Sequence, residues 1–127
     1  MQPERRKTAR YITKLDIDII LQDGTILPVQ TQDLSQSGLQ FKCDGSVANE
    51  IDTRGIQNHL LDHLKVKIIA RLPTDEKQKF YASGRIITAR RLSQEEYMLG
   101  LEFTDFEKNS AEILKNYIQQ LALDALG

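Results

Sequence analysis

The chain has 127 residues, of which 40% are hydrophobic and 28% charged, as expected for one soluble globular domain. Its net charge of −1 argues against a nucleic-acid binder held by counterion release, and no apolar run reaches the roughly 20 residues that span a bilayer. The start is polar, without the apolar stretch of a secretory signal. Cys43 is the single cysteine, which excludes an internal disulfide, and we expect it to be a small core residue of a cytoplasmic protein.

The basic charge is concentrated at one end of the chain. Residues 1–14 carry a net charge of +4, so the remaining residues carry −5. A basic terminus of this kind is either a solvated tail or a clamp for an anion, and charge alone does not decide between them. We treat residues 1–12 as a flexible basic arm and residues 13–127 as the folded domain.

Six segments have the pattern of β-strands. Apolar residues alternate with polar ones from Thr13 to Leu21, and the turn dipeptide Asp23-Gly24 joins this segment to a second one. The six segments are residues 13–21, 25–34, 39–43, 64–72, 80–90 and 97–104. Their short connections favour an antiparallel sheet, and closure into a barrel would remove its unpaired edges.

Two segments have helical spacing instead. Residues 46–63 lose the alternation, and Ile56, Leu60, Leu61 and Leu64 predict a short helix or an irregular excursion. Near the other end, Thr104 and Glu107 have the spacing of a helix capping box. A following apolar stripe comprises Leu114, Tyr117, Ile118, Leu121 and Ala125. The predicted fold class is therefore mainly β: a six-stranded antiparallel β-barrel with a C-terminal α-helix.

Residues suited to catalysis or metal binding do not form a recognisable set. His59 and His63 are four residues apart, but no third ligand or zinc-protease glutamate accompanies them, so a solvated or partly packed face is the simpler interpretation. Asp16 and Asp18 share one face of a strand and are interpreted as its solvent side. The chain also lacks the glycine-rich loops that cradle phosphates. We expect no catalytic residue, no metal and no cofactor, and therefore no enzyme.

Two short motifs remain that hydrophobic patterning does not require: Arg6 and Arg10 before the first strand, and Asp33, Ser35 and Gly38 before the third. Arginine presents a planar fork of donors that matches phosphate oxygens and also the O6/N7 edge of guanine. Asp33 would repel a bare phosphate but can accept hydrogen bonds from the ring N–H and amino group of guanine. Ser35 can donate or accept, and Gly38 can supply a positive φ or allow a close approach to the backbone. The combination favours a guanine nucleotide.

Together these residues resemble the signature of the PilZ domain family, which joins RxxxR (here residues 6–10) to [DN]xSxxG (here residues 33–38). The resemblance implies a six-stranded barrel with a trailing helix and a ligand, cyclic di-GMP, wrapped by the basic arm. It also implies that Arg6 and Arg10 hold phosphates and guanine edges, that Asp33 and Ser35 fix one guanine, and that Gly38 shapes the floor. Arg5 would influence whether one nucleotide or a stacked pair binds.

Such a receptor would regulate a downstream protein partner by changing its surface when the ligand binds. Two alternatives stay open: a PilZ-like scaffold that acts through protein contacts without a nucleotide, and a small barrel that binds single-stranded nucleic acid. The second alternative requires aromatic platforms, whereas most of the aromatic residues fall on core positions of the strands or on the terminal helix. We expect no nucleic-acid partner and no membrane insertion.

Overall fold

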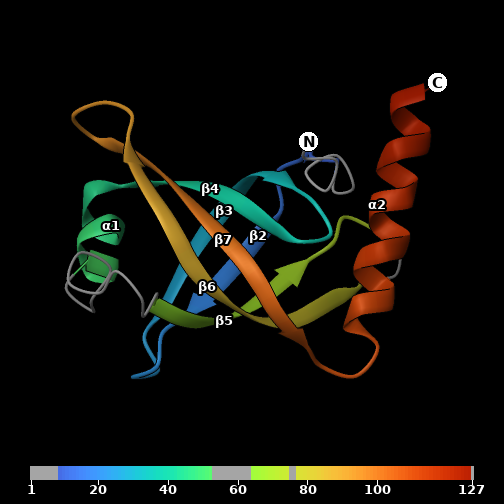
Figure 1. Ribbon diagram of the computed structural model, residues 1–127, viewed down its shortest axis with the longest axis horizontal. Helices are drawn as coiled ribbons and strands as arrows, with labels where there is room; N and C mark the ends of the chain where they lie inside the picture. Colours follow the sequence, from blue (N-terminus) through green and yellow to red (C-terminus); the bar gives the residue numbers. More distant parts are fainter. Residues whose placement is uncertain (1–8, 53–63, 75–76, 127) are drawn as a thin grey trace, which may run out of the picture.

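A computed structural model describes residues 9–52, 64–74 and 77–126 and contains one barrel with two helices (Figure 1). The elements in chain order are β1 (Tyr11–Ile12), β2 (Asp16–Ile20), β3 (Ile26–Leu34), β4 (Gly38–Asp44), α1 (Gly45–Asp52), β5 (Leu64–Arg71), β6 (Lys79–Arg91), β7 (Glu96–Phe106) and α2 (Ser110–Leu126). The predicted mainly β fold with a C-terminal helix is confirmed.

Six strands close the barrel in the order β3-β2-β5-β6-β7-β4, and β4 pairs back onto β3. All of the pairings are antiparallel. The short strand β1 lies outside this ring, where Tyr11 pairs with Leu34 and Ile12 with Asp33. The segment that we assigned to the arm, residues 1–12, thus contributes its last two residues to the sheet and is thereby attached to the end of β3.

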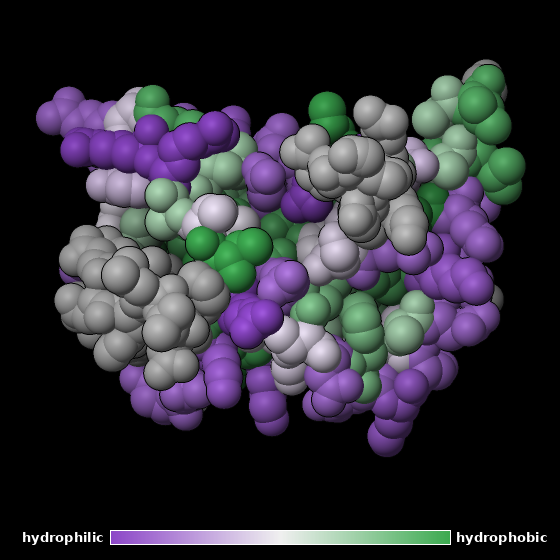
Figure 2. Space-filling model, viewed as in Figure 1, coloured by the Kyte–Doolittle hydropathy of each residue, from purple (hydrophilic) through white to green (hydrophobic). Residues whose placement is uncertain are grey.

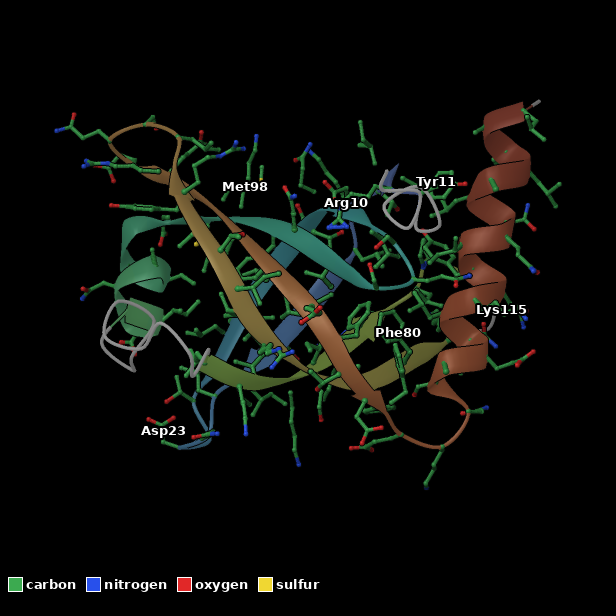
Figure 3. The ribbon with its side chains drawn as sticks, in the orientation of Figure 1. Arg10, Tyr11, Asp23, Phe80, Met98 and Lys115 are labelled. Atoms are coloured by element: carbon green, nitrogen blue, oxygen red, sulfur yellow. The ribbon has the colours of Figure 1, made fainter. Side chains whose placement is uncertain are left out.

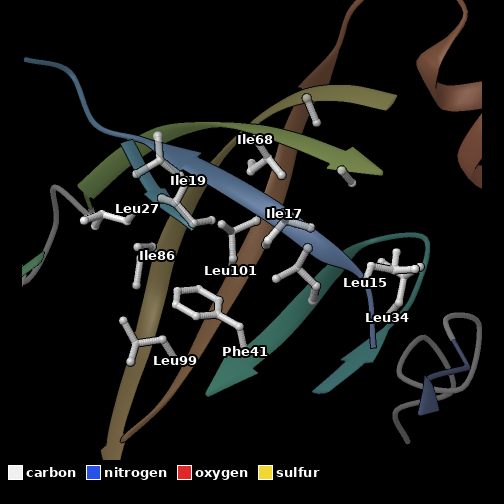
Figure 4. Packing of buried hydrophobic residues seen from close by; sticks show 14 of the residues in the cluster. Leu15, Ile17, Ile19, Leu27, Leu34, Phe41, Ile68, Ile86, Leu99 and Leu101 are labelled. Atoms are coloured by element: carbon white, nitrogen blue, oxygen red, sulfur yellow. The ribbon is translucent and has the colours of Figure 1, made fainter. Parts of the chain in front are cut away.

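The inward faces of the strands form one continuous apolar core (Figure 4). Ile17 and Ile19 on β2, Ile68 on β5 and Phe41 on β4 are almost completely buried, and each is followed along its strand by a residue on the outer face. This alternation is the period-two pattern that the sequence predicts. Cys43 packs against the same core, and burial, followed by the nearby charge of Asp44, raises the pKa of its thiol to about 11.

Local signals explain the first hairpin and the first helix. Gly24 adopts a positive φ of 92° in the turn between β2 and β3, as the Asp-Gly dipeptide predicts. The carboxylate of Asp44 accepts a hydrogen bond of 3.0 Å from the backbone N–H of Val47 and so caps α1. A helix, α1, thus occupies Gly45–Asp52 at the start of the segment for which a short helix or an irregular excursion was predicted, and Leu64, the last residue of the predicted stripe, belongs to β5 instead. The apolar stripe from Ile56 to Leu61 lies outside the described residues.

The predicted start of the C-terminal helix is wrong. Thr104 belongs to β7, which continues to Phe106, because β6 supplies hydrogen-bonding partners as far as the pair formed by Ala82 and Phe106. The helix begins at Ser110, whose hydroxyl accepts a 2.8 Å hydrogen bond from the backbone N–H of Tyr81. Long-range strand pairing thus overrides a local capping signal.

The apolar stripe on α2 is only partly buried. Leu114 and Ile118 face the barrel and are buried, whereas Ala125 at the end of the predicted stripe is exposed. The last turns of the helix project beyond the barrel, and the space-filling view shows an apolar patch over them (Figure 2). The helix therefore packs on the barrel through its first half.

Candidate ligand-binding site

The pairing of β1 with β3 positions Arg10. Since Tyr11 faces Leu34 and Ile12 faces Asp33, the next residue toward the N-terminus, Arg10, lies opposite Ser35. The guanidinium of Arg10 donates a hydrogen bond of 3.1 Å from Nη1 to the hydroxyl of Ser35. Its Nε lies 3.2 Å from Oδ1 of Asp33. The structure thus brings Arg10 to Asp33 and Ser35, from which it is far apart in the sequence.

A β-bulge directs Asp33 out of the core. Leu27, Val29 and Thr31 of β3 face inward, and a strict two-residue alternation would turn Asp33 inward as well. The register between β3 and β4 shifts between Thr31 and Asp33, so that Leu34 takes the next inward position and Asp33 faces outward. The sequence contains the signal, because an aspartate in phase with the core residues next to an out-of-phase leucine predicts such an irregularity.

The carboxylate of Asp33 is ion-paired with Arg10 but accepts no hydrogen bond at Oδ1 from the described residues. Its side chain is 17% exposed, and Oδ1 is buried without a hydrogen bond, because the approach of Arg10 Nε gives an ion pair without hydrogen-bond geometry. Oδ1 of Asp33 can therefore accept a donor that a ligand supplies.

Ser35 organises the turn between β3 and β4. Its hydroxyl oxygen accepts 3.2 Å hydrogen bonds from the backbone N–H groups of Ser37 and Gly38, in addition to the bond from Arg10. Its backbone N–H donates to the carbonyl of Gly38 over 2.9 Å. The hydroxyl is completely buried, and these contacts use its lone pairs. In this arrangement Ser35 holds Arg10 and the turn in place.

Gly38 is needed for packing and has no positive φ, contrary to one of the two roles considered from sequence. A Cβ atom at this position would lie 2.1 Å from the carbonyl oxygen of Leu101 on β7. Among the described glycines, the positive φ belongs to Gly24. Gly38 allows β4 to approach β7 closely at the point where the turn ends and β4 begins, and this positions the turn relative to the barrel.

A small platform extends from Asp33 across the outer face of the barrel, and sequence analysis missed it. Strand pairing places Gln40 beside Asp33, Gly100 beside Gln40, and Thr88 beside Gly100. Gly100 has no side chain, and a Cβ there would lie 2.4 Å from Oγ1 of Thr88, so the Thr88 side chain takes the space over the Gly100 backbone. Only the strand register identifies these residues as neighbours.

The next row of the same outer face adds cations. Lys42 pairs with Met98, and Met98 pairs with Arg90. The side chains of Lys42 and Arg90 are exposed, and Met98 lies between them in the register. Figure 3 shows Met98 on the same side of the barrel as Arg10. Positive charge thus lies on two sides of the platform.

Several predicted residues lie outside the described part of the chain. These are Arg5 and Arg6 of the basic motif, and His59 and His63 of the weak metal-binding pattern. Within the described ranges, no cluster of three or more histidine, cysteine or carboxylate side chains could hold a metal ion. The described candidate site therefore consists of Arg10, Asp33 and the Ser35–Gly38 turn.

The geometry agrees with a comparison against families of known proteins. The model of the PilZ domain matches residues 4–120, which is nearly the whole chain. This chain belongs to the PilZ domain family. The matched range includes the arginine motif, Asp33 and the Ser35–Gly38 turn, so the PilZ assignment and the observed site involve the same part of the chain.

Solved PilZ structures show the same fold. The Bacillus subtilis inhibitor of motility, MotI/DgrA, superposes with a TM-score of 0.70 at 16% sequence identity, over 94% of this chain and 52% of that protein. The PilZ domain of CeSA from a cellulose-synthesising bacterium has a TM-score of 0.57 at 17% identity, with 90% and 98% covered. Borreliella burgdorferi PlzA, in complex with c-di-GMP, has a TM-score of 0.56 at 15% identity, with 94% and 55% covered.

This PilZ chain thus spans about half the length of MotI/DgrA and of PlzA. A search of the curated proteins finds no match. In the part of the chain that the structure describes, neither helix is both long and apolar enough to cross a lipid bilayer.

Proposed function

We propose that this PilZ chain is a receptor for cyclic di-GMP and that it acts by binding, without catalysing a reaction. The observation that carries the proposal is the ion pair of Arg10 with Asp33, whose buried Oδ1 accepts no hydrogen bond from the described residues. Guanine has two adjacent donors, the ring N–H and the amino group, that fit a carboxylate. A site for phosphate alone would gain nothing from Asp33, since its charge repels the anion.

The guanine bases and the phosphates of the ligand each have complementary groups in the site. The free donors of Arg10 can reach the O6/N7 edge of the same guanine or a phosphate oxygen. Gln40 lies beside Asp33 in the register and can contact the nucleotide, and Lys42 and Arg90 supply positive charge for a second phosphate. By the family resemblance, Arg6 would take part in the clamp, and Arg5 would influence whether one or two nucleotides bind.

Two further observations support this ligand. PlzA is a PilZ-fold neighbour whose structure contains c-di-GMP. The barrel also lacks the aromatic platforms of single-stranded nucleic-acid binders. Of its aromatic side chains, only Tyr81, at 39% exposure, lies outside the core and its packed rim. We propose that binding orders the arm and changes the surface presented to a downstream protein in the cytoplasm.

Calorimetric titration with cyclic di-GMP, with GTP as the control ligand, tests the proposal. We expect a dissociation constant near 1 μM, which corresponds to about −8 kcal/mol. Arg10→Ala should weaken binding by about 10- to 100-fold, because a charge-assisted hydrogen bond contributes about 1.5–3 kcal/mol.

The matched control is Arg71→Ala, which removes another arginine–aspartate pair of the barrel, that between Arg71 and Asp18. Binding should be unchanged in this variant. Absence of binding by the unaltered protein would favour a PilZ scaffold that acts through protein contacts alone. Equal affinity of the Arg10→Ala variant would contradict the clamp.

A further inference from the structure

A groove of about 700 Å³ crosses the outer surface of the barrel at a distance from Arg10. Residues of β2, β5, β6 and β7 line it, together with Gly24 of the first hairpin. Figure 3 shows Asp23 of that hairpin and Arg10 at opposite sides of the molecule. The groove is therefore separate from the candidate nucleotide site.

The walls of the groove are cationic. Lys65 and Lys67 both face outward from β5, and the register places Lys65 directly beside Arg85 of β6. Arg85 forms a 3.0 Å ion pair with Glu102. No carboxylate among the described residues pairs with either lysine. Lys65, Lys67 and Arg85 are the charged residues that line the groove, and the register places the carboxylates Glu102 and Asp105 beside Arg85 and Ser83, on β7.

The floor of the groove contains a short side chain and an apolar one. Strand pairing places Lys67 between Ile20 on β2 and Ser83 on β6, so the middle of the groove is bordered by an isoleucine and a short side chain. Next to Ile20, Ile26 of β3 is 57% exposed. An occupant can therefore bury an apolar side chain against Ile20 while it neutralises the two lysines.

We propose that this groove, which we call the β5 groove, docks an acidic segment of another protein. Charge complementarity selects the acidic partner, because carboxylates would pair with Lys65 and Lys67, which have no counter-ion in the described structure. The apolar border selects a protein segment over a free inorganic anion, which would gain nothing from Ile20. Nucleic acid fits less well, since the groove contains no aromatic side chain on which a base could stack.

This surface lies beyond the proposed nucleotide site and does not require it. Because the two sites lie on different sides of the barrel, a nucleotide and a protein segment can occupy them together. The inference therefore stands or fails independently of cyclic di-GMP binding, and its test is made without nucleotide.

The experiment uses a labelled glutamate-rich peptide with two spaced leucines, titrated into the full chain at low salt and followed by fluorescence anisotropy and by amide chemical shifts. We expect the shifts to concentrate at Lys65, Lys67, Ser83 and Arg85. Lys67→Glu should weaken binding by about fivefold or more, since it turns an attraction into a repulsion at an exposed site. Added salt should weaken binding further because the cations are solvent-exposed.

The matched control is Lys115→Glu, the same charge reversal on exposed α2, for which affinity should not change (Figure 3). A peptide with lysine in place of glutamate should not bind. Shifts at other residues, or equal weakening by both substitutions, would overturn the proposal. Tighter binding of a single-stranded oligothymidine at the same residues would also overturn it and assign the groove to nucleic acid.

Discussion

Two positively charged regions of this barrel are built differently. Arg10 is held by the buried Ser35 hydroxyl and the Asp33 carboxylate, and a bulge and a tight turn fix both partners. Lys65 and Lys67 of the β5 groove are exposed on a regular strand with no described counter-ion. A fixed, partly buried arrangement discriminates between ligands by hydrogen-bond geometry, whereas exposed lysines attract any suitable negative charge.

The two regions differ in the backbone that positions their charged side chains. The arginine region depends on irregular backbone, because both the bulge before Asp33 and the Ser35–Gly38 turn interrupt the ladder. The β5 groove depends on regular pairing, which aligns outward side chains on adjacent strands. Substitutions that disturb the backbone should therefore affect the first region and leave the second functional.

Gly38→Ala should have the largest effect. The new Cβ would lie 2.1 Å from the Leu101 carbonyl oxygen, so β4 and β7 must separate at the turn. We expect the free energy of unfolding to fall by about 3 kcal/mol, at the upper end for an overpacked site. Urea unfolding followed by circular dichroism measures the change.

Gly45→Ala is the control for that substitution. A Cβ at Gly45 would meet only the Tyr97 ring, at 3.9 Å, and alanine is favoured over glycine in a helix by about 0.5–1 kcal/mol. This variant should be as stable as the unaltered protein or more stable. If both variants unfold at the same urea concentration, the close approach of β4 to β7 does not explain Gly38.

Thr31→Val should have a smaller and more selective effect. The buried hydroxyl of Thr31 accepts a 2.9 Å hydrogen bond from the Leu15 backbone N–H and donates one to the Thr13 carbonyl. Valine keeps the shape but leaves two backbone groups unpaired, which should lower stability by about 2 kcal/mol. Because the segment from Thr13 to Leu15 follows Arg10 in the chain, the affinity for cyclic di-GMP should also fall severalfold.

Binding of the acidic peptide in the β5 groove should not change in the Thr31→Val variant, whereas nucleotide binding should weaken. Thr104→Val, at an exposed position of β7, serves as the control for stability and should have little effect. A Thr31 variant with full stability and unchanged nucleotide affinity would show that the segment from Thr13 to Leu15 does not support Arg10.

Much of the fold and part of the site could be predicted from the sequence. Period-two alternation located the barrel strands, because burial on one face of a closed sheet is a local pattern. The predicted start of α2 was wrong, because hydrogen bonding between β6 and β7 overrides the capping signal at Thr104. The platform around Gly100 and the β5 groove could not be predicted, because each depends on which residues of distant strands become neighbours.

The central claim is that Arg10 and Asp33 together bind cyclic di-GMP. Amide chemical shifts recorded during titration with this nucleotide test it most directly. We predict large shifts from Asp33 to Gly38, together with Gln40 and Gly100, and no change at Lys65, Lys67 or Ser83. Shifts confined to the β5 groove, or no shifts at saturating nucleotide, would contradict the account.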